Sequence, residues 1–205
     1  MKIIHLSDTH GYFPTLIDSA SIVIHSGDLC KNETRGKSTE AQYQYYWVKG
    51  HLQEFKDQYE GRKLLLIPGN HDFIDFDLLV KMFKSVGIDA YNICNRTLEL
   101  DGITFYGFPY CPPITGEWNF ETAEEDINSR LKDIPQVDVL VTHSPPGNIL
   151  DGGFGSKAMS LWLSYGENIP KRAWLFGHMH DNFGTKEVMG IKFSNAATVQ
   201  NVIEI

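Results

Sequence analysis

Five short motifs along the chain place possible metal ligands next to small or turn-forming residues. The motifs are SDTHG (7–11), SGD (26–28), PGNHD (68–72), THSPP (142–146) and GHMH (177–180). Their candidate ligands are Asp8, His10, Asp28, Asn70, His143, His178 and His180. Imidazole nitrogens together with carboxylate and amide oxygens suit Mn²⁺, Fe²⁺, Zn²⁺ or Ni²⁺, and the lack of thiolates in the set argues against a structural zinc site.

The size and spacing of this set indicate a centre for two ions. It is too large for one tetrahedral ion, but it suits two ions about 3.5–4 Å apart that share a bridging carboxylate. Asp8 and His10 are separated by one residue, as are His178 and His180. Because alternate residues of an extended segment project to the same side, we expect each pair to approach the centre from one side.

Each motif taken alone also has a structural interpretation. Asp28 after a Ser-Gly pair could cap a helix, and GNHD could form an Asx turn. The functional interpretation rests on all five motifs occurring in order, each after an apolar run. His5, His25 and His51 lie inside expected strands or a helix with no second ligand nearby, so we expect structural roles for them.

The elements that must position these motifs alternate between strands and helices. Apolar runs predict strands at 2–6, 21–26, 62–67, 137–142 and 172–176, each ending at a motif. Helices are expected at 38–60, 75–87, 121–134 and 157–168, and hairpins at 96–109 and 185–196. In α/β sheets, ligands bind at the carboxyl edge of the strands. We expect a single α/β domain, residues 1–205, with two mixed sheets packed together and helices outside.

The composition narrows the classes of ligand that the protein is expected to bind. The formal net charge of −8 over 205 residues argues against extended nucleic acid and anionic membranes as ligands. It leaves small phosphorylated substrates open, because a bound metal supplies positive charge locally. Cys30, Cys94 and Cys111 lack a CxxC spacing, which favours reduced thiols. With no apolar run of 18 residues, the sequence indicates a cytoplasmic protein. It does not indicate an oligomeric state.

The ordered motifs Asp-x-His, GD, GNHD, THSPP and GHMH resemble those of the calcineurin-like metallophosphoesterase superfamily from Asp8 to about Asn195. The resemblance implies a four-layer α/β/β/α sandwich and two divalent ions, with Mn²⁺ favoured. It implies that Asp28 bridges the ions, that Asp8, His10 and His180 complete one shell, and that Asn70, His143 and His178 complete the other. His71 would be the catalytic histidine that contacts the phosphoryl group and assists the leaving oxygen.

The resemblance also implies a reaction, in which a metal-bridging hydroxide attacks phosphorus. The stretches 105–120 and 142–152 are similar to a compact phosphodiesterase subgroup with motifs like those of class III cyclic-nucleotide phosphodiesterases. We therefore expect a small phosphodiester substrate, such as a nucleotide diester or cyclic nucleotide. A phosphomonoesterase, a nucleotide pyrophosphohydrolase and an inactive metal-binding scaffold remain alternatives. The second motif, GDLCKNETRG, lacks the Gly-Asp-x-x-Asp-Arg form of phosphoprotein phosphatases.

Substrate selectivity must come from residues outside the metal shell. Phe108, Tyr110 and Trp118 lie in a Pro-rich segment and could form an apolar wall that stacks on a base. The alternative is that these aromatic side chains only pack the segment itself. The residue that orients His71 stays open, and the adjacent Asp72 is one candidate.

Overall fold

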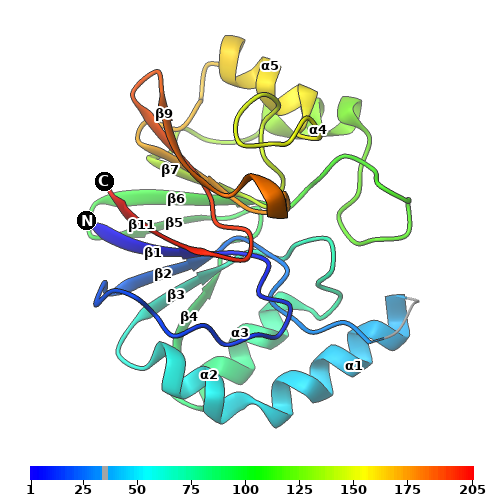
Figure 1. Cartoon of the computed structure of the whole chain (residues 1–205), viewed down its shortest axis with the longest axis vertical. Coiled ribbons are helices and arrows are strands. Elements are labelled where there is room, and N and C mark those ends of the chain that lie inside the picture. Colours follow the sequence, from blue (N-terminus) through cyan, green and yellow to red (C-terminus); the bar gives the residue numbers. More distant parts are fainter. Residues whose placement is uncertain (34–36) are drawn as a thin grey trace.

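The computed structural model describes residues 1–33 and 37–205, whose strands form two mixed sheets packed face to face (Figure 1). The first sheet, in the order β11-β1-β2-β3-β4, comprises β1 Lys2–Leu6, β2 Ile22–His25, β3 Lys63–Leu66, β4 Asp89–Asn92 and β11 Gln200–Glu204. The second, in the order β5-β6-β7-β8-β10-β9, comprises β5 Thr97–Leu100, β6 Ile103–Phe108, β7 Val139–Thr142, β8 Ala173–Phe176, β9 Gly184–Val188 and β10 Ile191–Asn195.

The central strands are apolar at almost every position because both of their faces are buried. Along β1, Ile3 faces the other sheet and Ile4 faces the helices. In β7, Val139 faces the other sheet and Leu140 the helices. The strands β1 to β4 are parallel, as are β6, β7, β8 and β10, so their carboxyl ends define one edge of each sheet.

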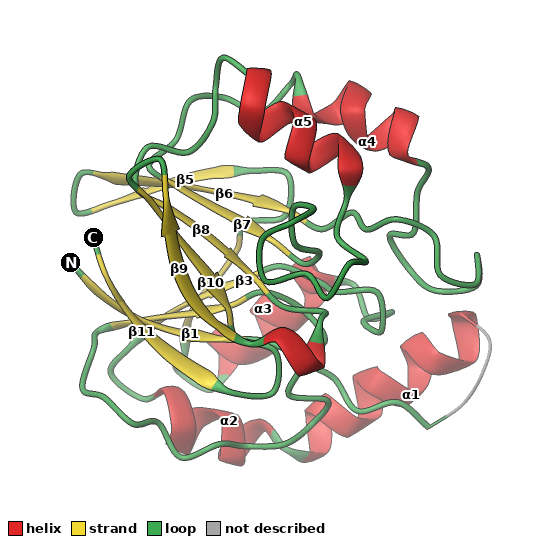
Figure 2. Ribbon diagram, turned by 45° about the horizontal axis from the view of Figure 1, so that its top comes forward, coloured by secondary structure: helices red, strands yellow, loops and turns green. Residues whose placement is uncertain are grey.

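The helices cover the two outer faces (Figure 2). They are α1 Lys37–Gly50, α2 Leu52–Tyr59, α3 Phe76–Ser85, α4 Glu124–Leu131 and α5 Lys157–Tyr165. Apolar residues of α1, α2 and α3 pack on the first sheet, and those of α4 and α5 pack on the second. A third apolar layer lies between the sheets. The predicted four-layer α/β/β/α arrangement is confirmed.

The structure corrects several predicted elements. The single helix expected at 38–60 is two helices, because the backbone of His51, between Gly50 and Leu52, leaves the helical region at φ −117° and ψ 20°. Two strands were not expected, β4 and β11. Both are edge strands with mixed polar sequences, DAYN and QNVIE, so neither carries a continuous apolar run. The two hairpins occur as predicted, β5 with β6 and β9 with β10.

Chain ends and helix lengths complete the description. The termini lie side by side because β1 pairs antiparallel with β11 (Figure 1). In the described part of the chain, no helix has the length and apolar composition needed to cross a bilayer.

A close approach of the two sheets at Gly107 gives a stability prediction. A methyl group added at Gly107 in β6 would collide with the Ile67 side chain and lie 2.6 Å from the Ile93 carbonyl oxygen. Gly107→Ala should therefore lower the free energy of unfolding by about 1–3 kcal/mol, measured by urea denaturation. Gly50→Ala is the control, because no atom lies within 4 Å of the added methyl group; in a helix it should stabilise by up to about 1 kcal/mol. Equal losses in both variants would contradict this packing.

Candidate functional site

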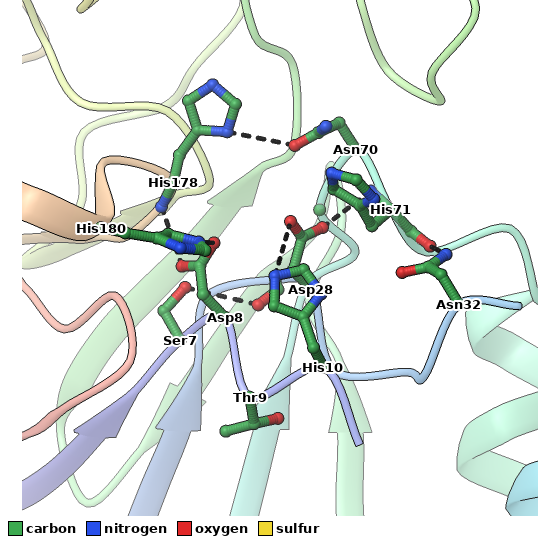
Figure 3. A network of polar contacts seen from close by, with 12 residues as sticks. Ser7, Asp8, Thr9, His10, Asp28, Asn32, Asn70, His71, His178 and His180 are labelled. Carbon is green, nitrogen blue, oxygen red and sulfur yellow. Dashed lines mark hydrogen bonds and ion pairs between the residues drawn. The ribbon is translucent and has the colours of Figure 1, made fainter. Parts of the chain in front are cut away.

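The predicted ligands lie together where the carboxyl ends of strands from both sheets meet (Figure 3). The turns after β1, β2 and β3 carry Asp8 with His10, Asp28 and Asn70, while those after β7 and β8 carry His143 and His178 with His180. Each turn is short and follows a buried strand, so the fold brings distant parts of the sequence to one point at the sheet edge.

The backbone that presents these ligands is not extended, contrary to the expectation from residue spacing. Asp8, His10, Asp28 and His178 all adopt left-handed conformations, with φ of 54°, 45°, 56° and 69°. His180 begins a short 3-10 helix, His180–Asn182. Left-handed backbone is uncommon for residues other than glycine and is concentrated at functional sites. Tight turns, rather than the alternation of side chains along a strand, therefore bring Asp8 together with His10 and His178 together with His180.

One group of ligand atoms surrounds the Asp8 carboxylate. One oxygen of Asp8 lies 3.2 Å from His180 Nε2, and the other accepts a hydrogen bond of 2.8 Å from the His178 backbone N–H. The His10 and His180 rings are 5.6 Å apart between centroids. Ligand atoms of Asp8, His10 and His180 all lie within 4.8 Å of one another.

A second group surrounds the buried ring of His143. Its Nδ1 lies 2.9 Å from the Ser26 carbonyl oxygen. Because a carbonyl only accepts, Nδ1 carries the hydrogen. Nε2 faces the Asn70 side-chain oxygen at 2.8 Å and His178 Nδ1 at 3.2 Å. In the protonated ring Nε2 donates to the Asn70 oxygen, and in the neutral ring its lone pair is available to a metal ion. A backbone carbonyl on the far nitrogen is typical of metal-binding histidines.

Asp28 lies between the two groups. Its Oδ2 is 3.8 Å from His10 Nε2 and 3.4 Å from His143 Nε2. Its Oδ1 accepts a hydrogen bond of 2.8 Å from the His71 backbone N–H. A single carboxylate oxygen is thus shared by one histidine of each group, which is the arrangement expected of a bridging ligand.

Charge interactions hold the site together. Burial opposes ionisation of Asp28 and His143, but their mutual attraction prevails. The pKa of Asp28 lies well below its ordinary value, and the pKa of His143 rises to about 9. Burial lowers the pKa of His178 to about 4, which leaves a neutral ring with a lone pair for a cation. The side-chain nitrogen of Asn70 is buried with no hydrogen-bond partner among the described residues. The imidazole nitrogens and the carboxylate and amide oxygens of this site fit borderline divalent ions.

Gly177 shows how closely the two sheets approach here. A methyl group at this position would collide with the Ser7 hydroxyl and with the Asp8 carboxylate. Any larger residue would therefore displace Asp8 from the group around His180. The glycine in the GHMH motif is required by this close approach.

His71 lies beside the candidate ligands but is held by other contacts. Its ring centroid is 5.2 Å from that of His10 and 4.1 Å from that of Trp118. Its carbonyl oxygen accepts hydrogen bonds from Asn32 and Gln44 at 2.9 Å and 2.7 Å. Burial lowers the pKa of His71, although the charge of Asp28 opposes this effect. Trp118 therefore forms one wall of the space that the ring occupies.

Asp72 does not orient the His71 ring. Its carboxylate is buried and accepts hydrogen bonds from the backbone N–H groups of Leu29, Cys30 and Gly69. It thereby joins the turn after β2 to the turn after β3, so Asp28 and Asn70 keep their relative positions. The other contacts of His71 are the Trp118 ring and the hydrogen bonds that its backbone carbonyl accepts.

An open hollow of about 580 Å³ adjoins the site and is called here the Ile114 hollow. Its floor contains the candidate ligands and His71, and its wall is apolar: Pro112, Pro113, Ile114, Phe154 and Met179. Sequence reasoning missed these wall residues. The Pro-Pro pair and the glycines flanking Phe154 were the available signals, but neither indicates which way a side chain faces.

The aromatic residues predicted to bind substrate have different positions. Phe108 is 1% exposed and packs in the core between the second sheet and its helices. Tyr110 packs under the Arg130 guanidinium, 4.5 Å from its ring centroid. Neither lines the hollow, because alternate residues of β6 and the segment after it face the helix layer. Of the three, Trp118 lies beside the site, against His71.

The histidines outside the set have structural partners. His5 is buried between the Ser26 and Ser194 hydroxyls at 2.9 Å and 2.7 Å. His25 Nε2 lies 3.0 Å from the Thr9 hydroxyl, and His51 Nδ1 lies 2.7 Å from the Trp47 carbonyl oxygen. These contacts agree with the structural roles expected for all three.

One carboxylate organises the loop that contributes Pro112, Pro113 and Ile114 to the wall. Glu121 accepts hydrogen bonds from the backbone N–H groups of Ile114, Thr115 and Trp118 at 2.6, 3.0 and 3.0 Å. Asn119 then joins this loop to the third motif, because its backbone N–H donates to the Asn70 carbonyl and its side chain donates to the Asp72 carbonyl.

This arrangement predicts the effect of Glu121→Gln. The amide would turn an N–H group toward one of the backbone donors, so we expect faster hydrogen exchange across 112–120, measured by mass spectrometry. Glu117→Gln is the control, because it removes the same charge from an exposed position of the same loop. Unchanged exchange in Glu121→Gln, or equal changes in both variants, would refute the role of Glu121.

The chain is similar in sequence to several known proteins. A UPF0046 protein of Caenorhabditis elegans is 27% identical and matches 96% of this chain and 69% of its own length. A probable rhamnogalacturonate lyase C of Emericella nidulans is 30% identical over 92% of the chain, and metallophosphoesterase domain-containing protein 1 of Homo sapiens is 24% identical over 89%. The chain spans only 18% and 61% of the last two.

Solved structures support the fold alone, since the identities are low. One chain superposes with a TM-score of 0.71 at 14% identity, covering 96% of this chain and 90% of its own length. A putative 5'-nucleotidase from Staphylococcus aureus gives 0.53 at 12% identity, covering 98% of this chain and 50% of its own. The sequence model described as calcineurin-like phosphoesterase matches residues 1–182. With its candidate metal-ligand groups at the shared edge of two sheets, the chain belongs to the calcineurin-like phosphoesterase family.

Proposed function

We propose that this protein is a dinuclear metal-dependent phosphodiesterase that hydrolyses small phosphodiesters of the nucleotide type. The family and the candidate ligand groups support metal-dependent hydrolysis of phosphoric esters. The observation that carries the dinuclear proposal is the Asp28 carboxylate oxygen between His10 and His143. Each histidine belongs to a different group of ligand atoms.

The ligand assignment follows from these groups. Asp8, His10 and His180 would hold one ion, Asn70, His143 and His178 would hold the other, and Asp28 would serve both. Divalent ions, of which Mn²⁺ is our choice, would supply Lewis-acid stabilisation of the phosphoryl oxygens and activate water. Asp72 accepts backbone hydrogen bonds from the turns that carry Asp28 and Asn70, which fixes the relative positions of these two donors.

His71 is proposed as the proton donor to the leaving oxygen. Its ring lines the same hollow as the candidate ligands, so a phosphoryl group at the ligands lies within its reach. A phosphoryl anion beside the ring favours the protonated form, which opposes the effect of burial on its pKa. The Trp118 ring behind it limits the positions that the imidazole can take.

The lining of the hollow supports a diester over more highly charged substrates. Among the described residues, no Lys or Arg lines it. Proteins that bind phosphomonoester dianions or pyrophosphates commonly use Arg or Lys to balance the additional charge. A diester carries one negative charge per phosphoryl group, which divalent ions at the ligands can balance.

The assignment predicts different metal losses in two variants. His178→Ala should weaken binding of the ion that Asn70 and His143 would hold. His180→Ala should weaken binding of the ion that Asp8 and His10 would hold. Each variant should bind one ion per chain at metal concentrations that load two ions on the native protein, measured by elemental analysis after dialysis. Retention of two ions in either variant would contradict the division.

The role of His71 predicts a separation of binding from turnover. His71→Ala should keep the metal content of the native protein, while kcat on a diester with an alkoxide leaving group, thymidylyl-(3′→5′)-thymidine, falls about 10²- to 10⁴-fold. Steady-state kinetics at matched metal loading would measure this. Turnover within a factor of three of the native protein would exclude the role.

The diester preference itself is tested with paired substrates. With Mn²⁺ bound, kcat/KM on bis(4-nitrophenyl) phosphate should exceed that on 4-nitrophenyl phosphate. Faster turnover of the monoester would instead support a phosphomonoesterase.

A further inference from the structure

A second open hollow, of about 650 Å³, adjoins the candidate ligands on the side of His10 and is called here the Tyr12 hollow. It shares Asp8 with the Ile114 hollow. Its other lining residues are Thr9, His10, Tyr12, Pro14, Thr15, Thr198, Val199 and Gln200. Two separate hollows therefore open onto one set of ligands.

We propose that the Tyr12 hollow is a second substrate subsite, which binds the ester group that stays on phosphorus after hydrolysis. This rests on the proposed phosphodiesterase function. A phosphodiester carries two organic groups on one phosphoryl group, whereas a monoester carries one. A centre flanked by two hollows matches the diester, with each organic group in its own hollow.

The position of His71 decides which group enters which hollow. His71 lines the Ile114 hollow and does not line the Tyr12 hollow. The leaving group therefore lies in the Ile114 hollow, where its oxygen receives the proton from His71. Water oxygen forms the new bond to phosphorus as the bond to the leaving oxygen breaks, and the proton released by the water replaces the one that His71 donates. The products are a free alcohol and a monoester whose remaining group still occupies the Tyr12 hollow.

The lining of the Tyr12 hollow indicates an uncharged, flat group with hydrogen-bonding edges. The Tyr12 side chain is 72% exposed at its rim, which leaves its ring open to stacking. Pro14 and Val199 add apolar surface, and Thr15 and Thr198 carry hydroxyls. Among the described lining residues there is no Lys or Arg. A nucleobase attached through its sugar has this combination of a ring face and polar edges.

The backbone of Thr198 is a separate observation in favour of a binding role. Thr198 is exposed and has φ of 60°, a conformation that is unfavourable for a β-branched residue. Its N–H donates to the Ser7 carbonyl at 3.2 Å, which fixes this turn beside Asp8. Strained residues of this kind are concentrated at ligand sites. Glycine would relieve the strain but would remove the hydroxyl.

The test compares two diesters with the same leaving group. These are thymidine 5′-(4-nitrophenyl phosphate), whose nucleoside can fill the Tyr12 hollow, and methyl 4-nitrophenyl phosphate, whose methyl group cannot. The native Mn²⁺-loaded protein should prefer the thymidine ester in kcat/KM. Tyr12→Ala should reduce that preference about 5- to 100-fold, the range expected for loss of one base–aromatic stack.

Two further variants separate binding from folding. Thr198→Gly should reduce the same preference while its melting temperature stays equal to or above that of the native protein. Tyr165→Ala removes an exposed tyrosine of α5 and should leave kcat/KM on both esters unchanged. Calorimetric titration with thymidine 5′-monophosphate gives a readout without turnover, and Tyr12→Ala should weaken that binding by a similar factor.

The outcomes distinguish this inference from the proposed function. An equal loss of kcat/KM on both esters in Tyr12→Ala would overturn the subsite. So would a native protein that shows no preference for the thymidine ester. Either result would leave the proposed phosphodiesterase function in place. If the native protein hydrolyses neither diester but does hydrolyse 4-nitrophenyl phosphate, the proposed function itself fails.

Discussion

The site depends on one buried carboxylate, that of Asp28. One of its oxygens lies between His10 and His143, which come from different sheets, and the other receives the backbone N–H of His71. A buried negative charge is costly unless cations and hydrogen-bond donors surround it. The residues that satisfy this one charge are also those that could bind ions and contact a phosphoryl group. The residues that surround and stabilise the Asp28 charge are therefore the same ones that the proposed metal centre needs in one place.

The fold permits this convergence because the two sheets pack face to face and the carboxyl ends of strands from both meet at one edge of the sandwich. Gly177 lets the second sheet contact Asp8, and Asp72 joins the turns that carry Asp28 and Asn70. Left-handed backbone at four candidate ligands turns their side chains inward within very few residues. The rigid apolar layer between the sheets holds these strained turns in place, as strained functional conformations require.

Under the proposed function, substrate selectivity would come from loops outside the two sheets. The Glu121 carboxylate holds the loop that forms one apolar wall, and the same loop places Trp118 against His71. On the opposite side, the turn at Thr198 borders a hollow of different character. The layers thus supply the centre, while several separate loops line the two hollows that the proposed substrate would occupy.

Sequence alone determined the residue types at the centre and the strands that precede them, because ligand chemistry and continuous apolar runs are local properties. Only the tertiary structure decided that Phe108 is core while Ile114 and Phe154 face the site. It also decided that turns rather than extended backbone orient Asp8 and His178. Such outcomes depend on packing between segments far apart in the chain, which no local pattern encodes.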